Sequence, residues 1–407
     1  MNTNILLEQA KKHMNFLCTT TNGRSVGSPG NRMATGYFKN ILEKNGWKTD
    51  ETKLYVIDWK TEGAILRCEN RNFEVFSSPY SRGCNVTGKF LPIDTIEKLQ
   101  TEEITGKILF LHGKIAAEQI MPKNFVFYNP DEHKQVVSVL EKNMPKAIIC
   151  ATGRNGMVAG GVYPFPMFED GDFDIPSVYM KDTEGEILLA CTGKEIELIS
   201  EAVRIPETAY NIAALKEGRS AEKIVVTAHI DAKIGTPGAI DNATGVTILL
   251  LLSELMKDYK GKYKIEIVAF NGEDYYAVPG QMKYLEQNTG KFNEIMLNIN
   301  IDGIGYKEGL TSFSVFDLPG FISEELTSTL KDNPGLTEGL PWVQGDHSMF
   351  VQAGRPAIAV SSNWFIENFS TQDITHTPKD NLEIVDYNRL PECALAIRDL
   401  IMRISDR

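Results

Sequence analysis

Apolar and polar stretches alternate after Tyr210 in a way that predicts a repeated order of strand, loop and helix. Short, almost wholly apolar runs predict strands covered on both faces, at 223–228, 263–270, 295–301 and 356–361. Segments with helical spacing of apolar residues lie between and after them, at 245–259, 280–287, 323–330 and 388–404. This order is typical of an α/β fold with a mostly parallel sheet flanked by helices.

The chain before Tyr210 shows two other residue patterns. Helical spacing predicts two helices, at 4–17 and 31–46, with a glycine-rich loop between them. From Cys68 to Arg204 the chain changes to short β-type runs separated by glycine, proline and acidic residues. We therefore expect a catalytic domain in two parts, 1–67 and 205–407, with an inserted, mainly β domain at 68–204.

Composition and charge narrow the classes of partner. The chain has 407 residues, of which 42% are hydrophobic, so it can bury a sizeable core. Its formal net charge of -12 repels phosphate backbones and anionic membrane surfaces, which argues against nucleic acid and membranes as partners. The longest apolar run, at 246–252, is far shorter than the roughly 20 residues that span a bilayer.

The amino terminus and the cysteines bear on the compartment. The first residues lack a basic segment followed by an apolar one, so we expect a cytoplasmic protein, or a secreted one if a leader has been removed. The six cysteines lie far apart without a Cys-x-x-Cys pair, which argues against a cysteine zinc site and a dense disulfide framework. Buried free thiols are the expected state.

Chemistry-bearing residues begin where the first strand of the α/β part ends. His229 directly follows that strand, and open α/β sheets place ligands outside the carboxyl ends of their strands. Asp231 points to the same side two residues later, so it can accept a hydrogen bond from the second ring nitrogen and fix the tautomer. Taken alone, the pair fits a hydrogen-bonded core histidine better than a metal site.

Acidic residues and a second histidine follow the later strands. Asp241 opens an apolar helix, where a helix cap is the better interpretation if it is taken alone. Glu273 and Asp274 follow the second strand, and adjacent like charges at a sheet edge are costly unless a cation or solvent offsets them. Asp302 follows the third strand and His376 lies in a polar loop after the fourth. Their coincidence in one domain favours a metal centre.

The expected ligands suit divalent metal ions. Two neutral imidazoles and the carboxylates of Asp241, Asp274 and Asp302 nearly balance two divalent cations, and one hydroxide completes the balance. Imidazole and carboxylate without thiolate suit Zn²⁺, with Co²⁺ or Mn²⁺ as substitutes. Two such ions about 3.5–4 Å apart polarise a carbonyl and lower the pKa of the attacking water. Glu273, which is left without a ligand role, is the candidate general base.

These residues resemble the di-zinc aminopeptidases related to bacterial secreted leucyl-type aminopeptidases, glutamate carboxypeptidase and glutaminyl cyclases. The resemblance covers most of the chain and implies the zinc-exopeptidase, phosphorylase/hydrolase-like fold. It rests on motifs that occur in the family's order: His229-x-Asp231, Gly238-Ala-Ile-Asp241-Asn-Ala-Thr-Gly245, Gly272-Glu273-Asp274, Asn300-Ile-Asp302-Gly, Asp346-His347-x-x-Phe350 with Ala353-Gly-x-Pro356, and His376-Thr-Pro-x-Asp380.

The resemblance also assigns roles. It implies that Asp241 bridges two metal ions, that His229 and Asp302 complete one site, and that Asp274 and His376 complete the other. Glu273 is then the base, and Asp231 supports the catalytic centre. The inserted domain looks like a protease-associated domain, a module that shapes substrate access and has no catalytic groups of its own.

Three details complete these expectations. The resemblance implies a cis peptide bond between Asp241 and Asn242. The family usually has Glu-Glu where this chain has Glu273-Asp274, and the shorter aspartate leaves one-metal occupancy as an alternative to two. Arg355 stands where the family tends to have an apolar residue, and we expect it to be an exposed loop residue.

The expected function is that of a metal-dependent exopeptidase that removes N-terminal residues from peptides. Alternatives on the same scaffold are a carboxypeptidase, a dipeptidase, a glutaminyl cyclase and a non-catalytic binding protein. A carboxypeptidase is expected to hold the substrate carboxylate with an arginine, and Arg355 is the only candidate near the late motif. Surplus acid around the expected metals instead favours a cationic α-amine.

Overall fold

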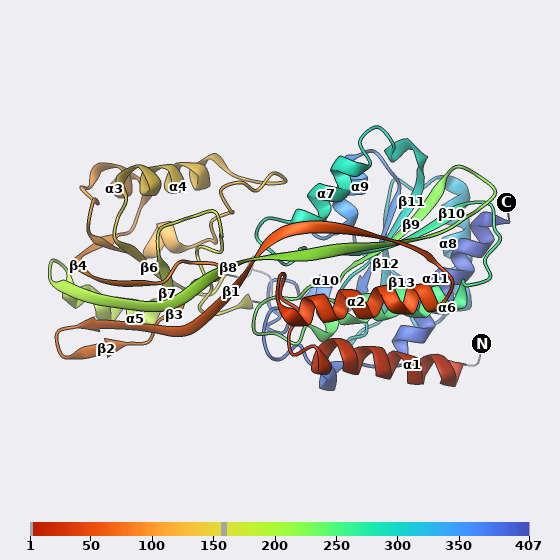
Figure 1. Ribbon diagram of the computed structural model, residues 1–407, viewed down its shortest axis with the longest axis horizontal. Helices are drawn as coiled ribbons and strands as arrows, with labels where there is room; N and C mark the ends of the chain where they lie inside the picture. The colour runs from red at the N-terminus through yellow and green to blue at the C-terminus, as the bar shows by residue number, and fades with distance from the viewer. Residues whose placement is uncertain (1–2, 156–160, 407) are drawn as a thin grey trace. The chain divides into compact units, whose positions relative to one another are not determined.

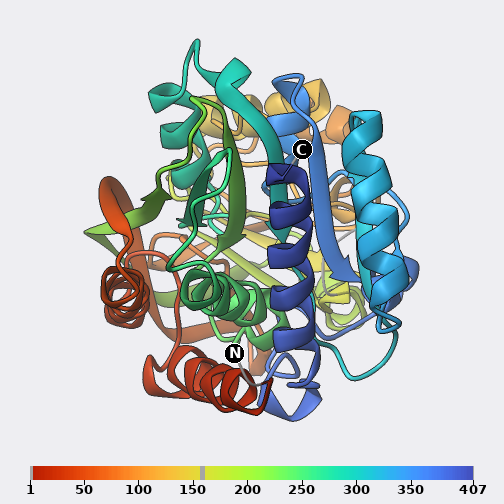
Figure 2. The ribbon, with the colours of Figure 1, turned by 90° about the vertical axis from the view of Figure 1, so that its right-hand side faces the viewer.

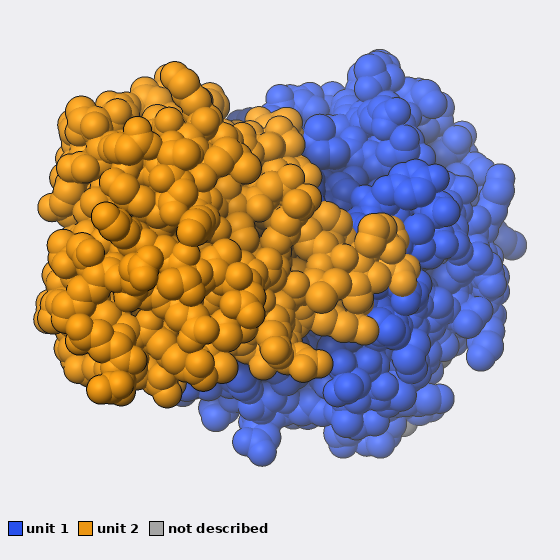
Figure 3. Space-filling model, turned by 60° about the vertical axis from the view of Figure 1, so that its left-hand side comes forward, with its two compact units in different colours: residues 1–56, 208–407 blue, residues 57–207 orange. Residues whose placement is uncertain are grey.

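A computed structural model describes residues 3–155 and 161–406. The chain forms two compact units, which are coloured separately in Figure 3: unit 1 is Met1–Val56 with Thr208–Arg407, and unit 2 is Ile57–Glu207. The sequence placed the limits of the insert at 68 and 204, whereas the units divide at 57 and 207. The division falls inside two long strands, β1 (Lys48–Cys68) and β8 (Glu195–Lys216), each of which continues across it.

Unit 1 is built on a mixed sheet in the order β13-β12-β14-β11-β9-β10-β8. Its four central strands, from β14 to β10, are mutually parallel, whereas β8 and β12 run antiparallel to their neighbours β10 and β14. The predicted α/β class with a mostly parallel sheet is therefore confirmed, with all four predicted strands at its centre. Besides β8, the strands are β9 (Lys223–His229), β10 (Lys264–Phe270), β11 (Ile295–Ile301), β12 (Thr311–Phe316), β13 (Leu336–Glu338) and β14 (Ala357–Ser362).

Helices cover both faces of this sheet. Alternate residues of β9 serve the two faces: Ile224 and Val226 belong to the large apolar cluster with α1, α2, α6, α8 and α11, and Val225 belongs to a smaller cluster with α7 and α9. Helix α11 packs beside α6 on the face of the sheet that has the large apolar cluster (Figures 1 and 2). The helices are α1 (Thr3–Asn15), α2 (Pro29–Lys44), α6 (Thr244–Leu255), α7 (Pro279–Gln287), α8 (Gly320–Asp332), α9 (His347–Gln352), α10 (Asn363–Glu367) and α11 (Arg389–Ser405).

Unit 2 has its own sheet and two apolar clusters. Its strands follow the order β8-β4-β5-β6-β7-β3, and β2 pairs with β1. Successive residues of β5 alternate between the clusters, so this sheet too is covered on both faces. Besides β1 and β8, its elements are β2 (Arg71–Phe73), β3 (Phe76–Ser77), β4 (Cys84–Ile93), α3 (Ile96–Thr101), β5 (Ile108–Leu111), α4 (Asp131–Asn143), β6 (Ala147–Thr152), β7 (Ser177–Lys181) and α5 (Asp182–Leu188).

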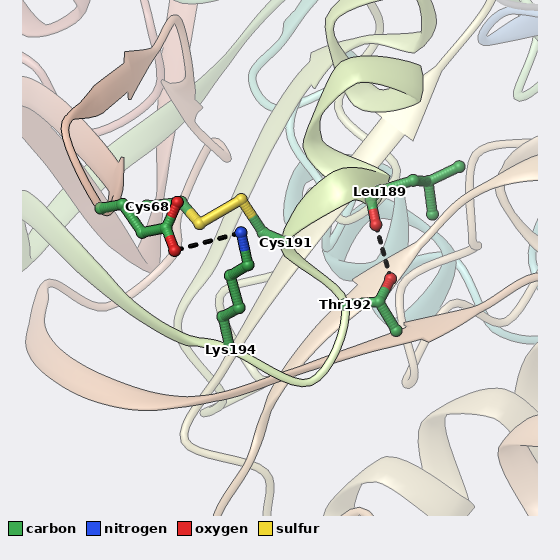
Figure 4. Close-up of a disulfide and its surroundings, with 6 residues drawn as sticks. Cys68, Leu189, Cys191, Thr192 and Lys194 are labelled. Carbon is green, nitrogen blue, oxygen red and sulfur yellow. Dashed lines mark hydrogen bonds and ion pairs between the residues drawn. A yellow bond between two sulfur atoms is a disulfide. The ribbon is translucent and has the colours of Figure 1, made fainter.

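Two of the six cysteines are not free thiols, which corrects the expectation from the sequence. Cys68, the last residue of β1, forms a disulfide with Cys191, and their Cα atoms are 6.6 Å apart. Figure 4 shows this bond with Lys194 beside it. Lys194 forms an ion pair with Glu69 (3.1 Å). A separation of 123 residues hid the pairing, because spacing patterns reveal only short-range partners. Cys150 and Cys393 are buried free thiols, as expected.

Within the described ranges, no helix is both long and apolar enough to cross a membrane.

Candidate metal centre

The expected ligands meet at one edge of the unit 1 sheet. His229 is the last residue of β9 and pairs in register with Phe270, the last residue of β10. Asp302 directly follows β11, and the Glu273 and Asp274 loop follows β10. Because these strands are parallel, their carboxyl ends lie together.

Asp241 lies between the two imidazoles. Its Oδ1 is 3.0 Å from His229 Nε2, and its Oδ2 is 3.1 Å from His376 Nε2. Each ring also faces a second carboxylate: His229 Nε2 is 3.6 Å from Asp302 Oδ1, and His376 Nε2 is 3.0 Å from Asp274 Oδ1. The five side chains therefore form two imidazole–carboxylate pairs that share one carboxylate.

The loop that carries Asp241 is not a regular helix start. The peptide bond from Asp241 to Asn242 is cis, as the resemblance implies, and both residues have non-helical backbone angles. The N-cap position of the following helix is Ala243, not Asp241. The side chain of Asn242 contacts the first turn of that helix, because its Oδ1 accepts a hydrogen bond from the N–H of Gly245 (3.1 Å). The Asp241 carboxylate is left to face the histidines.

Unpartnered buried atoms test whether this site fits a metal. Both ring nitrogens of His229 and Oδ2 of Asp274 are buried without a hydrogen-bond partner. Buried polar atoms are normally hydrogen-bonded, so Asp274 Oδ2 and one nitrogen of the neutral His229 ring are available to a cation. One ligand atom from each of His229, Asp241 and Asp274 lies within 4.8 Å of the others. Imidazole nitrogen and carboxylate oxygen are the donors that suit zinc, so the residues present fit the ion.

The electrostatics of the site show a need for positive charge. Burial opposes a charged His376 ring, but the carboxylates of Asp274 and Asp241 raise its pKa to about 10. Burial likewise opposes a charged His229, while Asp302 and its neighbours raise its pKa well above the usual value. Protons on the rings thus supply charge that a cation would otherwise supply, so metal binding should release them.

Asp231 holds the neighbouring loop in place. Its carboxylate accepts hydrogen bonds from the main-chain N–H groups of Gly272 (2.7 Å), Glu273 (3.2 Å) and Asp274 (3.0 Å). Its Oδ1 lies 3.7 Å from His229 Nδ1, which is too far for the hydrogen bond expected from the sequence. The side chain of Asp231 therefore connects the end of the His229 strand to the main chain of the Asp274 loop.

Asp380 holds the backbone at Asp241 in the same way as Asp231 holds the Asp274 loop. Its two oxygens accept hydrogen bonds from the N–H groups of Ile240 (2.7 Å) and Asp241 (3.0 Å). Burial, with the nearby Asp241 charge, raises its pKa to about 7. The motif that begins at His376 therefore contributes both a candidate ligand and a support for the shared carboxylate.

Glu273 and Asp346 are further carboxyl groups beside the centre. Burial raises the pKa of Glu273 well above its usual value, and the charges of Asp274 and Asp302 add to this. Asp346 is buried, accepts a hydrogen bond from Gln281 Nε2 (2.8 Å), and has its pKa raised by burial to about 7. A carboxyl group whose pKa is raised in this way is suited to accept and return a proton.

Two residues in and beside the late motif, His347 and Arg355, are held by main-chain carbonyls. His347 Nε2 lies 2.8 Å from the Trp342 carbonyl oxygen, and burial lowers the pKa of His347 to about 4. Arg355 is half-buried, not exposed, and its Nε donates to the carbonyl of Ile295 (2.7 Å). Ile295 begins β11, so Arg355 lies at the amino end of the sheet, opposite to the edge with the candidate ligands. This position rules it out as the arginine that a carboxypeptidase would need.

Two polar residues, in the glycine-rich loop and at the start of α2, were not predicted to contribute to the centre. Arg24 is fully buried and hydrogen-bonded to the loop that precedes Asp241, and Asn31 is bonded to Asn271 before Glu273. The loop texture gave no indication of these contacts. The only sign in the sequence was that Arg24, a charged residue, lies between two predicted helices with apolar faces.

Comparison with known proteins finds a family match within the second half of the chain. Residues 211–401 match the sequence profile of peptidase family M28. The matched residues include every candidate ligand described above, while Arg24 and Asn31 lie outside them.

Individual proteins are similar to larger parts of the chain. Aminopeptidase YwaD of Bacillus subtilis is 26% identical over 262 residues, which are 61% of this chain and 54% of the relative. The chain thus spans about half the length of the curated relatives it matches. An aminopeptidase from Aneurinibacillus sp. strain AM-1 superposes with a TM-score of 0.75 at 19% identity, covering 97% of this chain and 93% of that one. BSAP, a zinc aminopeptidase from Bacillus subtilis, gives a TM-score of 0.72 at 18% identity, with coverages of 97% and 94%. These two likenesses show the fold.

Proposed function

We propose that this chain is a zinc-dependent aminopeptidase that removes N-terminal residues from peptides. The observation that carries the proposal is the shared Asp241 carboxylate, whose two oxygens face two imidazoles, each with a carboxylate of its own. Its relatives named as aminopeptidases support the same activity. Two zinc ions are the proposed complement, with one ion as the alternative if Asp274 holds its ion weakly.

Each residue has a proposed task. His229 with Asp302, and His376 with Asp274, would hold the ions, and Asp241 would bridge them. Bound zinc would polarise the substrate carbonyl and acidify a water molecule. Glu273 would accept the proton of that water and pass it to the departing amine, for which its raised pKa is suited.

The charges around the centre favour an amine over a carboxylate at the substrate end. Arg355 lies at the opposite end of the sheet, and Lys379 is already paired with Asp373. The guanidinium of Arg24 is bonded to main-chain carbonyls. In their ionised forms, Glu273 and Asp346 would attract a cationic α-amine. The proposed direction is therefore cleavage from the amino end.

A panel of dipeptides in three forms tests this proposal with the zinc-loaded chain. We expect free dipeptides and their carboxy-amidated forms to be cleaved, and amino-acetylated forms to be left intact. The opposite pattern would establish a carboxypeptidase. Loss of ammonia from N-terminal glutamine without cleavage would establish a glutaminyl cyclase, and a chain that binds no zinc would contradict the proposal altogether.

Unit 2 and the compartment complete the proposal. The metal-ligand cluster found among the described residues lies wholly in unit 1, so unit 2 is proposed to be a protease-associated module that shapes substrate preference.

Disulfides persist in oxidising compartments, so the Cys68–Cys191 bond favours a secreted product over a cytoplasmic one. Alkylation of thiols in the native host before lysis tests this, since a cytoplasmic chain would be modified at Cys68.

A further inference from the structure

Arg24 joins the two ends of the loop between the candidate ligands His229 and Asp241. Its side chain is 1% exposed. Its guanidinium donates to four main-chain carbonyl oxygens, those of Ile230 (3.0 Å), Leu17 (2.7 Å), Pro237 (2.8 Å) and Gly238 (2.8 Å). Ile230 directly follows His229, and Gly238 lies shortly before Asp241, so one side chain fixes the loop at both ends.

Asn31 makes the equivalent connection to the second loop. Its side-chain amide and that of Asn271 donate to each other, at 2.9 Å in both directions. Asn271 lies just before Glu273 and Asp274. Asn31 Nδ2 also donates to the carbonyl of Arg24 (3.0 Å), so the two connections belong to one buried network.

The fit around Arg24 leaves little freedom for another arrangement. Gly238 has a φ of +59°, and a Cβ atom there would lie 2.9 Å from Arg24 Nη2. A buried guanidinium is costly unless its donors are satisfied, and three of the four carbonyls that accept from it belong to the ligand-bearing loop. The cation is therefore placed where its hydrogen bonds fix the loop geometry.

We propose that Arg24 and Asn31 are positioning residues that set the zinc affinity of the centre. The inference rests on the proposed function, because it requires that His229, Asp241 and Asp274 hold zinc. Metal ligands held in a preformed geometry bind more tightly than ligands that must be ordered by the ion. The two residues supply that order from a segment more than 200 positions away in the chain.

The test measures the zinc dissociation constant of each variant by competition with a chromophoric chelator. Replacing outer partners of metal ligands typically costs 10–100-fold in affinity, so Arg24→Met should weaken zinc binding about tenfold or more. Asn31→Ala should weaken it in the same direction. Arg24→Lys should recover part of the loss, because an ammonium group reaches fewer carbonyls than a guanidinium.

Matched controls separate positioning from a general loss of stability. Arg32→Met removes an arginine that donates to Gly27 within its own segment, and Asn40→Ala changes an exposed residue of the same helix. Both should leave the dissociation constant within about twofold of the unaltered chain. Unfolding of the metal-free proteins, followed by circular dichroism, shows which variants are folded before zinc is added.

The outcomes distinguish the inference from the proposed function. A folded Arg24→Met chain with unchanged zinc affinity would overturn the inference alone. If Arg24→Met does not fold, then Arg24→Lys decides: unchanged zinc affinity together with an unchanged Co²⁺ absorption spectrum would overturn it. An unaltered chain that binds neither zinc nor cobalt would contradict the proposed function, and this inference with it.

Discussion

The carboxylates of this centre differ in their hydrogen-bond partners. The oxygens of Asp231 and Asp380 accept main-chain N–H groups, which fix both side chains as parts of the framework. Asp241 instead turns its oxygens to two imidazoles. Glu273 lies on the Asp231-held loop, where burial raises its pKa. The residue types are alike, so their hydrogen bonds decide which are supports and which are reactive.

The Glu273→Gln variant should keep the fold and the zinc content and lose turnover. Glutamine preserves the size of the side chain and removes its ability to accept a proton, so we expect turnover to fall by roughly 100-fold or more. Metal analysis and peptide cleavage, measured on the same preparation, check both parts. Asp274→Glu is the control, because it restores the family's usual residue and should retain or tighten zinc binding. Full activity of Glu273→Gln would remove Glu273 from the mechanism.

His13 should make the stability of unit 1 depend on pH. Burial, with the charge of Lys12, lowers its pKa to about 4 from an ordinary value near 6.5, while its Nδ1 lies 2.7 Å from the Tyr37 hydroxyl. Below pH 6.5, His13 is protonated in the unfolded chain but stays neutral in the folded chain. The contribution of His13 to the free energy of unfolding is therefore fully present above pH 6.5 and is lost as the pH falls toward 4. The loss from this group is on the order of 2 kcal/mol between pH 7 and 4.5.

Urea unfolding of the metal-free chain at several pH values checks this dependence. The His13→Gln variant should show a shallower fall in the free energy of unfolding over the same range. His112→Gln is the control, since His112 is less deeply buried and its pKa is lowered less. Equal slopes for His13→Gln and the unaltered chain would contradict the assignment.

At the scale of elements, the sequence predicted what local periodicity determines. The central strands of unit 1 were found because strands covered on both faces are almost wholly apolar, as β11 is. The helix α4 was missed, although its buried residues Val136, Val137 and Leu140 have helical spacing, because short strands dominate the surrounding texture. The long strands β1 and β8 were also missed, since exposed polar positions interrupt their apolar pattern.

The same reasoning applies to the candidate centre. Its expected ligands could be chosen because each follows a strand directly or lies in an adjoining loop, and parallel strand ends meet at one edge. The contacts of Arg24 and Asn31 could not be predicted, because they join residues 206 and 240 positions apart. The disulfide was missed for the same physical reason. Side chains that act at long range leave no periodic signal.

The start of α6 is an element whose packing can be tested. A Cβ atom on Gly245 would lie 2.6 Å from the carbonyl oxygen of Ile301 in β11 and would also meet the Asn242 side chain. Gly245→Ala should therefore lower the free energy of unfolding by about 1–3 kcal/mol, because the helix must move away from the sheet.

Gly36→Ala is the matched control for this substitution. Gly36 is an exposed residue within α2, and a Cβ atom there would meet nothing within 4 Å. Alanine should stabilise that helix by about 0.5–1 kcal/mol. Urea unfolding of both metal-free variants gives the two free energies. A loss at Gly36 as large as that at Gly245 would show that the close approach to Ile301 is not the cause.

At the scale of the whole molecule, each of the two units has apolar clusters of its own among the residues that the structure describes. The clusters of unit 1 draw their buried residues from 1–56 and 208–407, and those of unit 2 draw theirs from 57–207. Every candidate ligand and support of the metal centre also lies in unit 1. Burial of apolar surface is the main stabilising contribution to folding, so each unit has its own source of stability.

Joining Val56 to Thr208 through a short glycine-rich linker should therefore leave a folded, zinc-binding unit 1. The strands β1 and β8, which pair with each other, would then be connected as a hairpin. We expect one cooperative unfolding transition and the zinc stoichiometry of the full chain, with an altered preference among peptides because unit 2 is absent. The isolated segment 57–207, with its Cys68–Cys191 bond, is the reciprocal control and should also unfold cooperatively. Loss of the cooperative transition in the joined chain would show that unit 1 depends on unit 2 for its stability, despite its separate interior.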